Sequence, residues 1–209
     1  MKLFLSSLAI SPETIAAFEA LVGKDISSIK MALSENAADV YDEKDKRFVY
    51  DTRTSLENTG MQIDRFDLRE YVQKVSVLRA LLETYDVVWF GGGNTYYLRW
   101  LMRESGFDTI VGEVLQSGVV YGGGSAGAVV AGKDIRYYDT VDDPICSPEV
   151  IFSGLRLTNV AIIPHWGTES IKKELENIKR SFLSVGVTAV TLTDEQSIII
   201  NNDEIEVVP

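Results

Sequence analysis

Short apolar runs alternate with longer amphipathic stretches along the chain. Runs of four to eight residues rich in Val, Ile, Leu and Phe are typical of buried strands. The stretches between them have helical character: Leu98, Leu101 and Met102 follow helical spacing, and Ser11-Pro12-Glu13 is a helix start. We expect strands at residues 2–7, 26–33, 61–68, 86–90, 119–122 and 160–163.

This alternation predicts an α/β fold with a doubly wound, mainly parallel sheet and helices on both faces, because parallel strands need crossover helices. A length of 209 residues suits a single domain over residues 1–209. The polar segment 41–58 indicates a helix or a mobile excursion, and segment 137–148 a long loop. Residues 187–208 predict two or three strands with turns at 193–195 and 201–203, a hairpin or sheet edge.

Composition narrows the class of protein. Apolar residues make up 45% and charged residues 24%, as in packed globular domains. The net charge of −11 argues against sequence-independent binding of nucleic acid, which needs clustered Lys and Arg. Cys146 is the only cysteine, so an intrachain disulfide is excluded. The first apolar run is too short for a signal peptide, and an apolar stretch of about 18 residues is absent, so we expect a cytoplasmic protein without a membrane span.

A glycine-rich turn follows the strand at 119–122 and contains G-x-S-x-G at Gly123, Ser125 and Gly127. Glycines allow a serine on a sharp strand-to-helix turn to project its hydroxyl group outward. The free N–H groups and positive dipole of the following helix would stabilise an oxyanion. This pattern predicts that Ser125 is a nucleophile.

Two other interpretations of the turn are open. Gly122, Gly124 and Gly127 also satisfy the dinucleotide-binding pattern G-x-G-x-x-G, but only a short helix fits before the Asp-rich loop. The turn could also be structural, or a nest of N–H groups that binds an anion. We favour the nucleophile, and we expect no cofactor.

The only histidine, His165, follows the strand at 160–163. Because ligands of open α/β sheets bind at the carboxyl ends of the strands, His165 is the candidate general base for Ser125. A second glycine loop, Gly91-Gly92-Gly93-Asn94-Thr95, should lie at the same edge, where it would supply an oxyanion donor beside the N–H of Ala126. With one His and one Cys, a metal site of the usual zinc type is not expected.

The two glycine motifs and Pro164-His165, in this order and at these separations, resemble the dipeptidase E and cyanophycinase family of serine peptidases. That resemblance implies a fold like the class I glutamine amidotransferases, whose nucleophile is Cys where this chain has Ser125. It implies that Ser125 attacks a peptide carbonyl, that His165 transfers the proton, and that Gly93 and Ala126 hold the oxyanion. For the third catalytic residue the resemblance favours Asp142, with Asp139, Asp143 and Glu169 as alternatives.

The sequence says less about the substrate than about the catalytic residues. The aspartyl dipeptidases carry a basic residue after the histidine, whereas here none precedes Lys172, which leaves Arg99, Arg136 or Lys172 to bind an acidic group. Asn94, Arg136 and Trp166 are candidate substrate-binding residues, and a site lined by Trp166, Tyr137 and Tyr138 would favour another small peptide. We therefore expect a serine peptidase that hydrolyses short peptides. The alternative is a non-catalytic protein that binds a small ligand on the same scaffold and lacks an acid to orient His165. The oligomeric state is not indicated.

Overall fold

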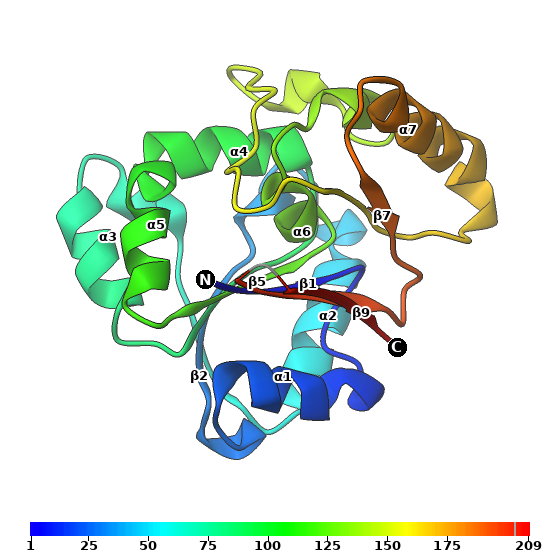
Figure 1. Cartoon of the computed structure of the whole chain (residues 1–209). Coiled ribbons are helices and arrows are strands. Elements are labelled where there is room, and N and C mark those ends of the chain that lie inside the picture. The colour runs from blue at the N-terminus through cyan, green and yellow to red at the C-terminus, as the bar shows by residue number, and fades with distance from the viewer. Residues whose placement is uncertain (203) are drawn as a thin grey trace.

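A central sheet divides the protein into two layers of helices (Figure 1). The structure is a computed structural model that describes residues 1–202 and 204–209, and within them the sheet has seven strands in the order β3-β2-β4-β5-β1-β8-β9. The first five are parallel, β8 is antiparallel to β1, and β9 to β8. The predicted α/β fold is confirmed. The strands are β1 (Lys2–Ser6), β2 (Lys30–Ser34), β3 (Gln62–Arg65), β4 (Val87–Phe90), β5 (Val120–Gly124), β8 (Ser197–Asn201) and β9 (Glu204–Val208).

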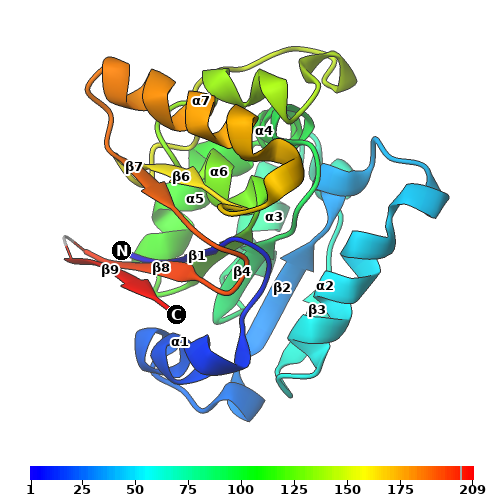
Figure 2. The same cartoon turned by 90° about the vertical axis from the view of Figure 1, so that its right-hand side faces the viewer.

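Helices cover both faces of this sheet because its strands are apolar on both sides. In β4, Val87 and Trp89 pack on the face of α1 and α2, whereas Val88 and Phe90 pack on the opposite face. Figure 2 shows α1 and α2 on one side and the other helices on the other. The helices are α1 (Ile15–Val22), α2 (Arg47–Glu57), α3 (Val75–Leu82), α4 (Thr95–Glu104), α5 (Phe107–Gln116), α6 (Ala126–Val130) and α7 (Lys172–Ser184).

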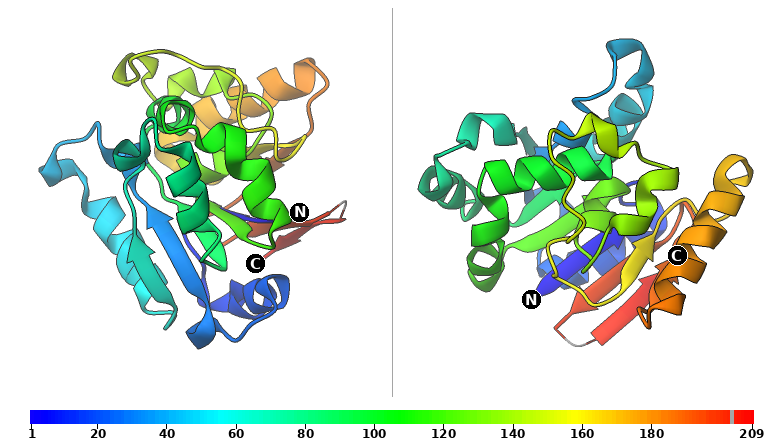
Figure 3. Two further views of the ribbon diagram at one scale, coloured as in Figure 1. Left: turned by 90° about the vertical axis from the view of Figure 1, so that its left-hand side faces the viewer. Right: turned by 90° about the horizontal axis from the view of Figure 1, so that it is seen from above.

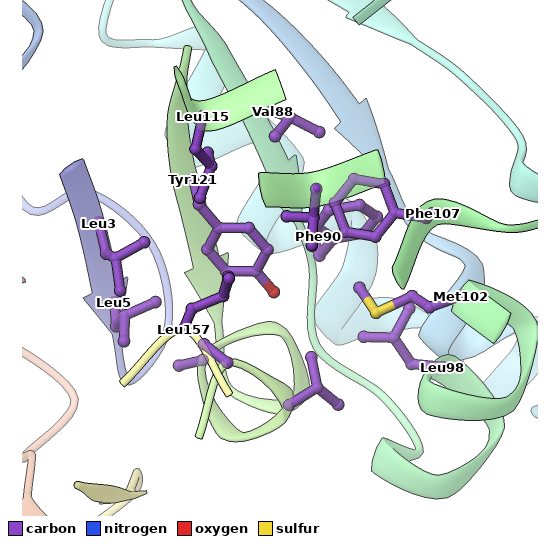
Figure 4. Packing of buried hydrophobic residues seen from close by; sticks show 14 of the residues in the cluster. Leu3, Leu5, Val88, Phe90, Leu98, Met102, Phe107, Leu115, Tyr121 and Leu157 are labelled. Atoms are coloured by element: carbon purple, nitrogen blue, oxygen red, sulfur yellow. The ribbon is translucent and has the colours of Figure 1, made fainter. Parts of the chain in front are cut away.

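The larger apolar cluster lies between the sheet and α3 to α6 (Figure 4). Tyr121 of β5 is fully buried there, and its ring stacks on Phe90 at a centroid distance of 5.6 Å. Its hydroxyl group donates a hydrogen bond of 2.7 Å to the carbonyl of Gly127. Because Gly127 belongs to α6, this bond ties the start of that helix to the strand before it, on either side of Ser125.

The predicted strand at 160–163 exists but does not join the central sheet. β6 (Ala161–Ile163) pairs in parallel with β7 (Ala189–Thr191) in a separate two-stranded sheet. The position beside β1, where a sixth parallel strand would lie, is taken by β8. The small sheet and α7 lie on the side of the central sheet that α4 and α6 cover (Figures 2 and 3). A third apolar cluster, which includes Val129, Ala161 and Phe182, holds this layer in place.

The remaining segments agree with the expectations in outline. Segment 41–58 contains α2, and segment 137–148 is a loop with two single turns of 3-10 helix, Arg136–Thr140 and Pro144–Cys146. Segment 187–208 gives three strands, and β8 and β9 form a hairpin at the sheet edge. The second predicted turn, at 201–203, includes Asp203, which lies outside the described residues. Every helix in the described part of the chain is too short or too polar to cross a bilayer.

Candidate active site

Ser125 lies on a sharp turn between β5 and α6, at the carboxyl edge of the central sheet. Its backbone has φ 50° and ψ −112°, a conformation that few non-glycine residues adopt. The two glycines of the motif are required by close packing. A Cβ on Gly123 would lie 2.4 Å from the carbonyl carbon of Gly127, and one on Gly127 would lie 2.0 Å from the carbonyl oxygen of Phe90. The turn therefore has the geometry expected of a nucleophile.

His165 follows β6 and faces Ser125. Its Nε2 lies 2.9 Å from Ser125 Oγ, within hydrogen-bonding distance of the hydroxyl group. Packing between α6 and β6, through Val129 and Ala161, brings the two residues together although β6 lies outside the central sheet. The two residues that the sequence predicted as nucleophile and base are thus in contact, in the arrangement by which a histidine accepts a serine proton.

Asp194, which lies between β7 and β8, is the carboxylate at the other ring nitrogen. His165 Nδ1 lies 2.7 Å from Asp194 Oδ1. The chain reaches this position because the segments after β6 and β7 continue side by side: Trp166 N–H donates to the carbonyl of Leu192 over 2.9 Å. The hydrogen bond with His165 lowers the pKa of Asp194 and so favours its charged form.

Ser7, immediately after β1, connects these groups. Its hydroxyl group accepts a hydrogen bond of 2.7 Å from the backbone N–H of His165 and donates one of 2.7 Å to Asp194 Oδ1. The residue is fully buried. Neither Ser7 nor Asp194 was predicted as a site residue from sequence. The only sequence signals were that Ser7 ends a predicted strand and that Asp194 lies in a predicted polar turn.

In the described part of the chain, none of the acids favoured by the resemblance hydrogen-bonds to His165. Asp142, expected at His165, instead accepts a hydrogen bond of 3.0 Å at Oδ2 from the backbone N–H of Thr95, which has no partner within α4. Its hydrogen-bond partner is thus the start of α4 rather than His165. Asp143 caps a short turn by accepting from Ile145 N–H, Glu169 pairs with Lys172, and Asp139 is exposed. Burial raises the pKa of Asp142.

The glycine loop after β4 adjoins Ser125. A Cβ on Gly92 would lie 3.2 Å from Ser125 Cβ, and one on Gly93, which has φ 142°, would lie 2.3 Å from the carbonyl carbon of Ala37. Asn94 caps α4 by accepting from Tyr97 N–H over 2.9 Å. The N–H groups of Gly93 and Ala126, the expected oxyanion donors, make no hydrogen bond with the described residues.

A pocket of about 160 Å³ opens beside Ser125. Its reactive and charged groups come from Ser125, His165 and Asp142. An apolar wall is formed by Val129, Val141, Ile171 and Leu175. Tyr138 also lines the pocket. The candidate substrate-binding residues are Asn94, Arg136 and Trp166, and each has a contact within the protein. Asn94 caps α4, Arg136 pairs with Asp134, and the ring of Trp166 lies 4.7 Å from Lys179 Nζ.

Comparison with known proteins agrees with this architecture. An uncharacterized peptidase of Listeria innocua is 24% identical over 186 residues, which cover 88% of this chain and 84% of that protein. Peptidase E of Haemophilus influenzae is 33% identical over 144 residues, 69% of this chain and 59% of that protein. A crystal structure of a candidate peptidase E from Listeria monocytogenes EGD-e has a TM-score of 0.82 at 21% identity, over 99% of this chain and 96% of that chain.

The family model of peptidase family S51 matches residues 14–208, nearly the whole chain. This match and the peptidase E relatives confirm the resemblance that the sequence motifs indicated. The chain belongs to peptidase family S51 and is a serine-type peptidase.

Proposed function

We propose that this peptidase hydrolyses short peptides, with Ser125 as nucleophile, His165 as general base and Asp194 as the acid that orients His165. One observation carries the proposal: a continuous chain of contacts runs from Ser125 Oγ to His165 Nε2 at 2.9 Å and from His165 Nδ1 to Asp194 Oδ1 at 2.7 Å. Asp194 thus takes the role that the resemblance had given to Asp142.

The contacts suggest how each group acts. Asp194 accepts a hydrogen bond from the Nδ1–H group of His165, which leaves Nε2 free to accept a proton from Ser125. As Oγ bonds to the peptide carbonyl carbon, its proton moves to Nε2 and the carbonyl electrons move to oxygen. The C–N bond then breaks and Nε2 gives its proton to the leaving amine. Water, deprotonated by His165, releases the acyl group from Ser125 in the same way.

Gly93 and Ala126 are proposed as the donors for the oxyanion. Ala126 is the first residue of α6, so its N–H has no partner within the helix and lies at the positive end of the helix dipole. Gly93 lies in the loop that contacts Ser125. Loss of one such donor costs about 10²- to 10³-fold in turnover in other serine peptidases.

The size of the pocket supports short substrates. Its volume of about 160 Å³ lies below the roughly 300 to 1,000 Å³ of pockets that bind drug-sized ligands. A pocket of this size suits a single small residue of the substrate. The alternative of a non-catalytic binding protein supposed that no acid orients His165, and a carboxylate at 2.7 Å supports catalysis instead.

The proposal is tested by mass spectrometry of the intact protein after reaction with an uncharged fluorophosphonate. Wild type should gain one adduct, Ser125→Ala none, and His165→Ala an adduct that forms far more slowly. Ser27→Ala, at an exposed serine, is the matched control and should react like wild type. The same variants are assayed with a dipeptide library, in which Ser125→Ala should be inactive. No adduct on wild type, or an adduct that persists in Ser125→Ala, would contradict the proposal.

A further inference from the structure

Asp142 is a partly buried carboxylate beside the nucleophile that the proposed reaction does not use. It lines the same pocket as Ser125 and Ala126. Its Oδ2 accepts from Thr95 N–H over 3.0 Å, and within the described part of the chain Oδ1 has no hydrogen-bond partner. A charged carboxylate in such a place is costly unless it meets a positive group, as the raised pKa of Asp142 indicates. A positive group of the substrate is the partner for Asp142 that the pocket can admit.

The pocket has little to offer an acidic side chain of the substrate, because the N–H of Ala126 is assigned to the oxyanion of the scissile carbonyl. None of its described lining residues is Lys or Arg. The three cations that sequence suggested for an acidic substrate are engaged elsewhere: Arg99 pairs with Asp108 at 3.0 Å, Arg136 with Asp134 at 2.7 Å and Lys172 with Glu169 at 3.2 Å. An acidic side chain in the pocket would face Asp142 without compensation.

A dipeptide has an ammonium group at one end and a carboxylate at the other, so only its N-terminal residue suits a pocket with a carboxylate and an apolar wall. The α-ammonium group is separated from the scissile carbonyl carbon by one atom, which agrees with Asp142 and Ser125 lining the same small cavity. We infer that Asp142 binds the α-ammonium group of the substrate's N-terminal residue and that this pocket rejects an acidic side chain. The inference rests on the proposed function of Ser125.

The test compares kcat/KM for Asn-Ala, Asp-Ala and N-acetyl-Asn-Ala. The first two have the same shape and differ in side-chain charge, and the third lacks the ammonium group. Wild type should prefer Asn-Ala to each of the others by about tenfold or more. Asp142→Asn should lower kcat/KM for Asn-Ala by roughly 10- to 100-fold and remove most of both preferences. Asp139→Asn, an exposed charge on the same loop, is the matched control and should keep them.

A second measurement separates this role from a catalytic one. The uncharged fluorophosphonate has no ammonium group, so its reaction with Ser125 should slow far less in Asp142→Asn than hydrolysis of Asn-Ala does. Equal losses for the probe and every peptide would mean that Asp142 acts on His165, and would overturn the inference. A wild-type preference for Asp-Ala would also overturn the inference. Rapid cleavage of N-acetyl-Lys-Ala would overturn it too, because the positive group in the pocket would then be a side-chain ammonium. A wild type that forms no adduct would refute the proposed function itself.

Discussion

Ser125 and His165 hydrogen-bond to each other from backbones that both have positive φ, 50° and 60°. Each such conformation costs about 1–3 kcal/mol for a non-glycine residue. The end of β1 holds both of them: the carbonyl of Ser6 accepts from Ser125 N–H over 3.1 Å, and the hydroxyl of Ser7 accepts from His165 N–H over 2.7 Å. One short segment therefore positions both residues.

Ser7→Ala should lower kcat by about tenfold or more with little change in KM, because Ser7 holds the backbone of His165 and a misplacement of about 1 Å at a reacting group can cost about 100-fold. It should also destabilise the fold by about 1–3 kcal/mol, because the partly buried N–H of His165 loses its acceptor. Steady-state kinetics and thermal unfolding measure the two effects. Ser7→Thr keeps a hydroxyl and should recover part of the loss. Ser6→Ala removes a buried hydroxyl that bonds to no described residue, and should change kcat less. An unchanged kcat in Ser7→Ala would contradict the positioning role.

Asp194→Asn should reduce kcat by roughly 10³- to 10⁴-fold, because an amide no longer holds the His165 proton on Nδ1. The Asp194 side chain is 45% exposed, so thermal stability at pH 7 should change little. Release of free amine from a dipeptide, followed beside circular dichroism melting, measures both. If Asp142→Asn reduced turnover of all substrates more than Asp194→Asn does, Asp142 would be the orienting acid after all.

Asp142→Asn should not destabilise the protein at pH 7, and should raise its Tm. Burial raises the pKa of Asp142 in the folded state above its unfolded value of about 3.9. Stability from such a group is fully present below the unfolded pKa and is lost as pH rises through the folded pKa. At pH 7, well above the unfolded pKa, burial of this carboxyl group therefore costs stability, whereas an amide oxygen can still accept from Thr95 N–H. The difference in Tm between wild type and variant should shrink below about pH 4, as melting curves from pH 3 to 8 would show. A variant less stable than wild type at pH 7 would contradict this account.

Gly92→Ala should mainly lower kcat, whereas Gly93→Ala should mainly lower the free energy of unfolding. A methyl group on Gly92 would lie 3.2 Å from Ser125 Cβ, so the nucleophile must shift by a few tenths of an ångström, and we expect about a tenfold loss of kcat with a nearly unchanged Tm. A methyl group on Gly93 would lie 2.3 Å from the backbone of Ala37 at φ 142°, so we expect a loss of about 2 kcal/mol or more in unfolding free energy. Denaturant unfolding with parallel kinetics tests both, and equal Tm losses would contradict the distinction.

Sequence was most informative where the signal was local. Gly123, Ser125 and Gly127 are contiguous in one turn, and His165 is the only histidine, so neither needed knowledge of the fold. Asp194 could not be found in this way, because Thr193-Asp194-Glu195 looks like any polar turn. Its place depends on β7 running beside β6 and on β8 pairing with β1, which are contacts between segments far apart in sequence. The same holds for Asp142, whose contact with Thr95 N–H joins positions 47 residues apart in sequence.

The separation of β6 and β7 from the central sheet means that the proposed nucleophile and general base belong to different packing units. Ser125 is attached to the central sheet, whereas His165 is attached to the layer of β6, β7 and α7, which docks on α4 and α6 through the third apolar cluster. Local opening of that layer would part the two residues while the central sheet stayed intact, since proteins open in such cooperative segments at less than the global free energy. Mild denaturant should then abolish peptide hydrolysis before it reduces ellipticity, so enzymatic activity reports on the docking of one layer rather than on the fold as a whole.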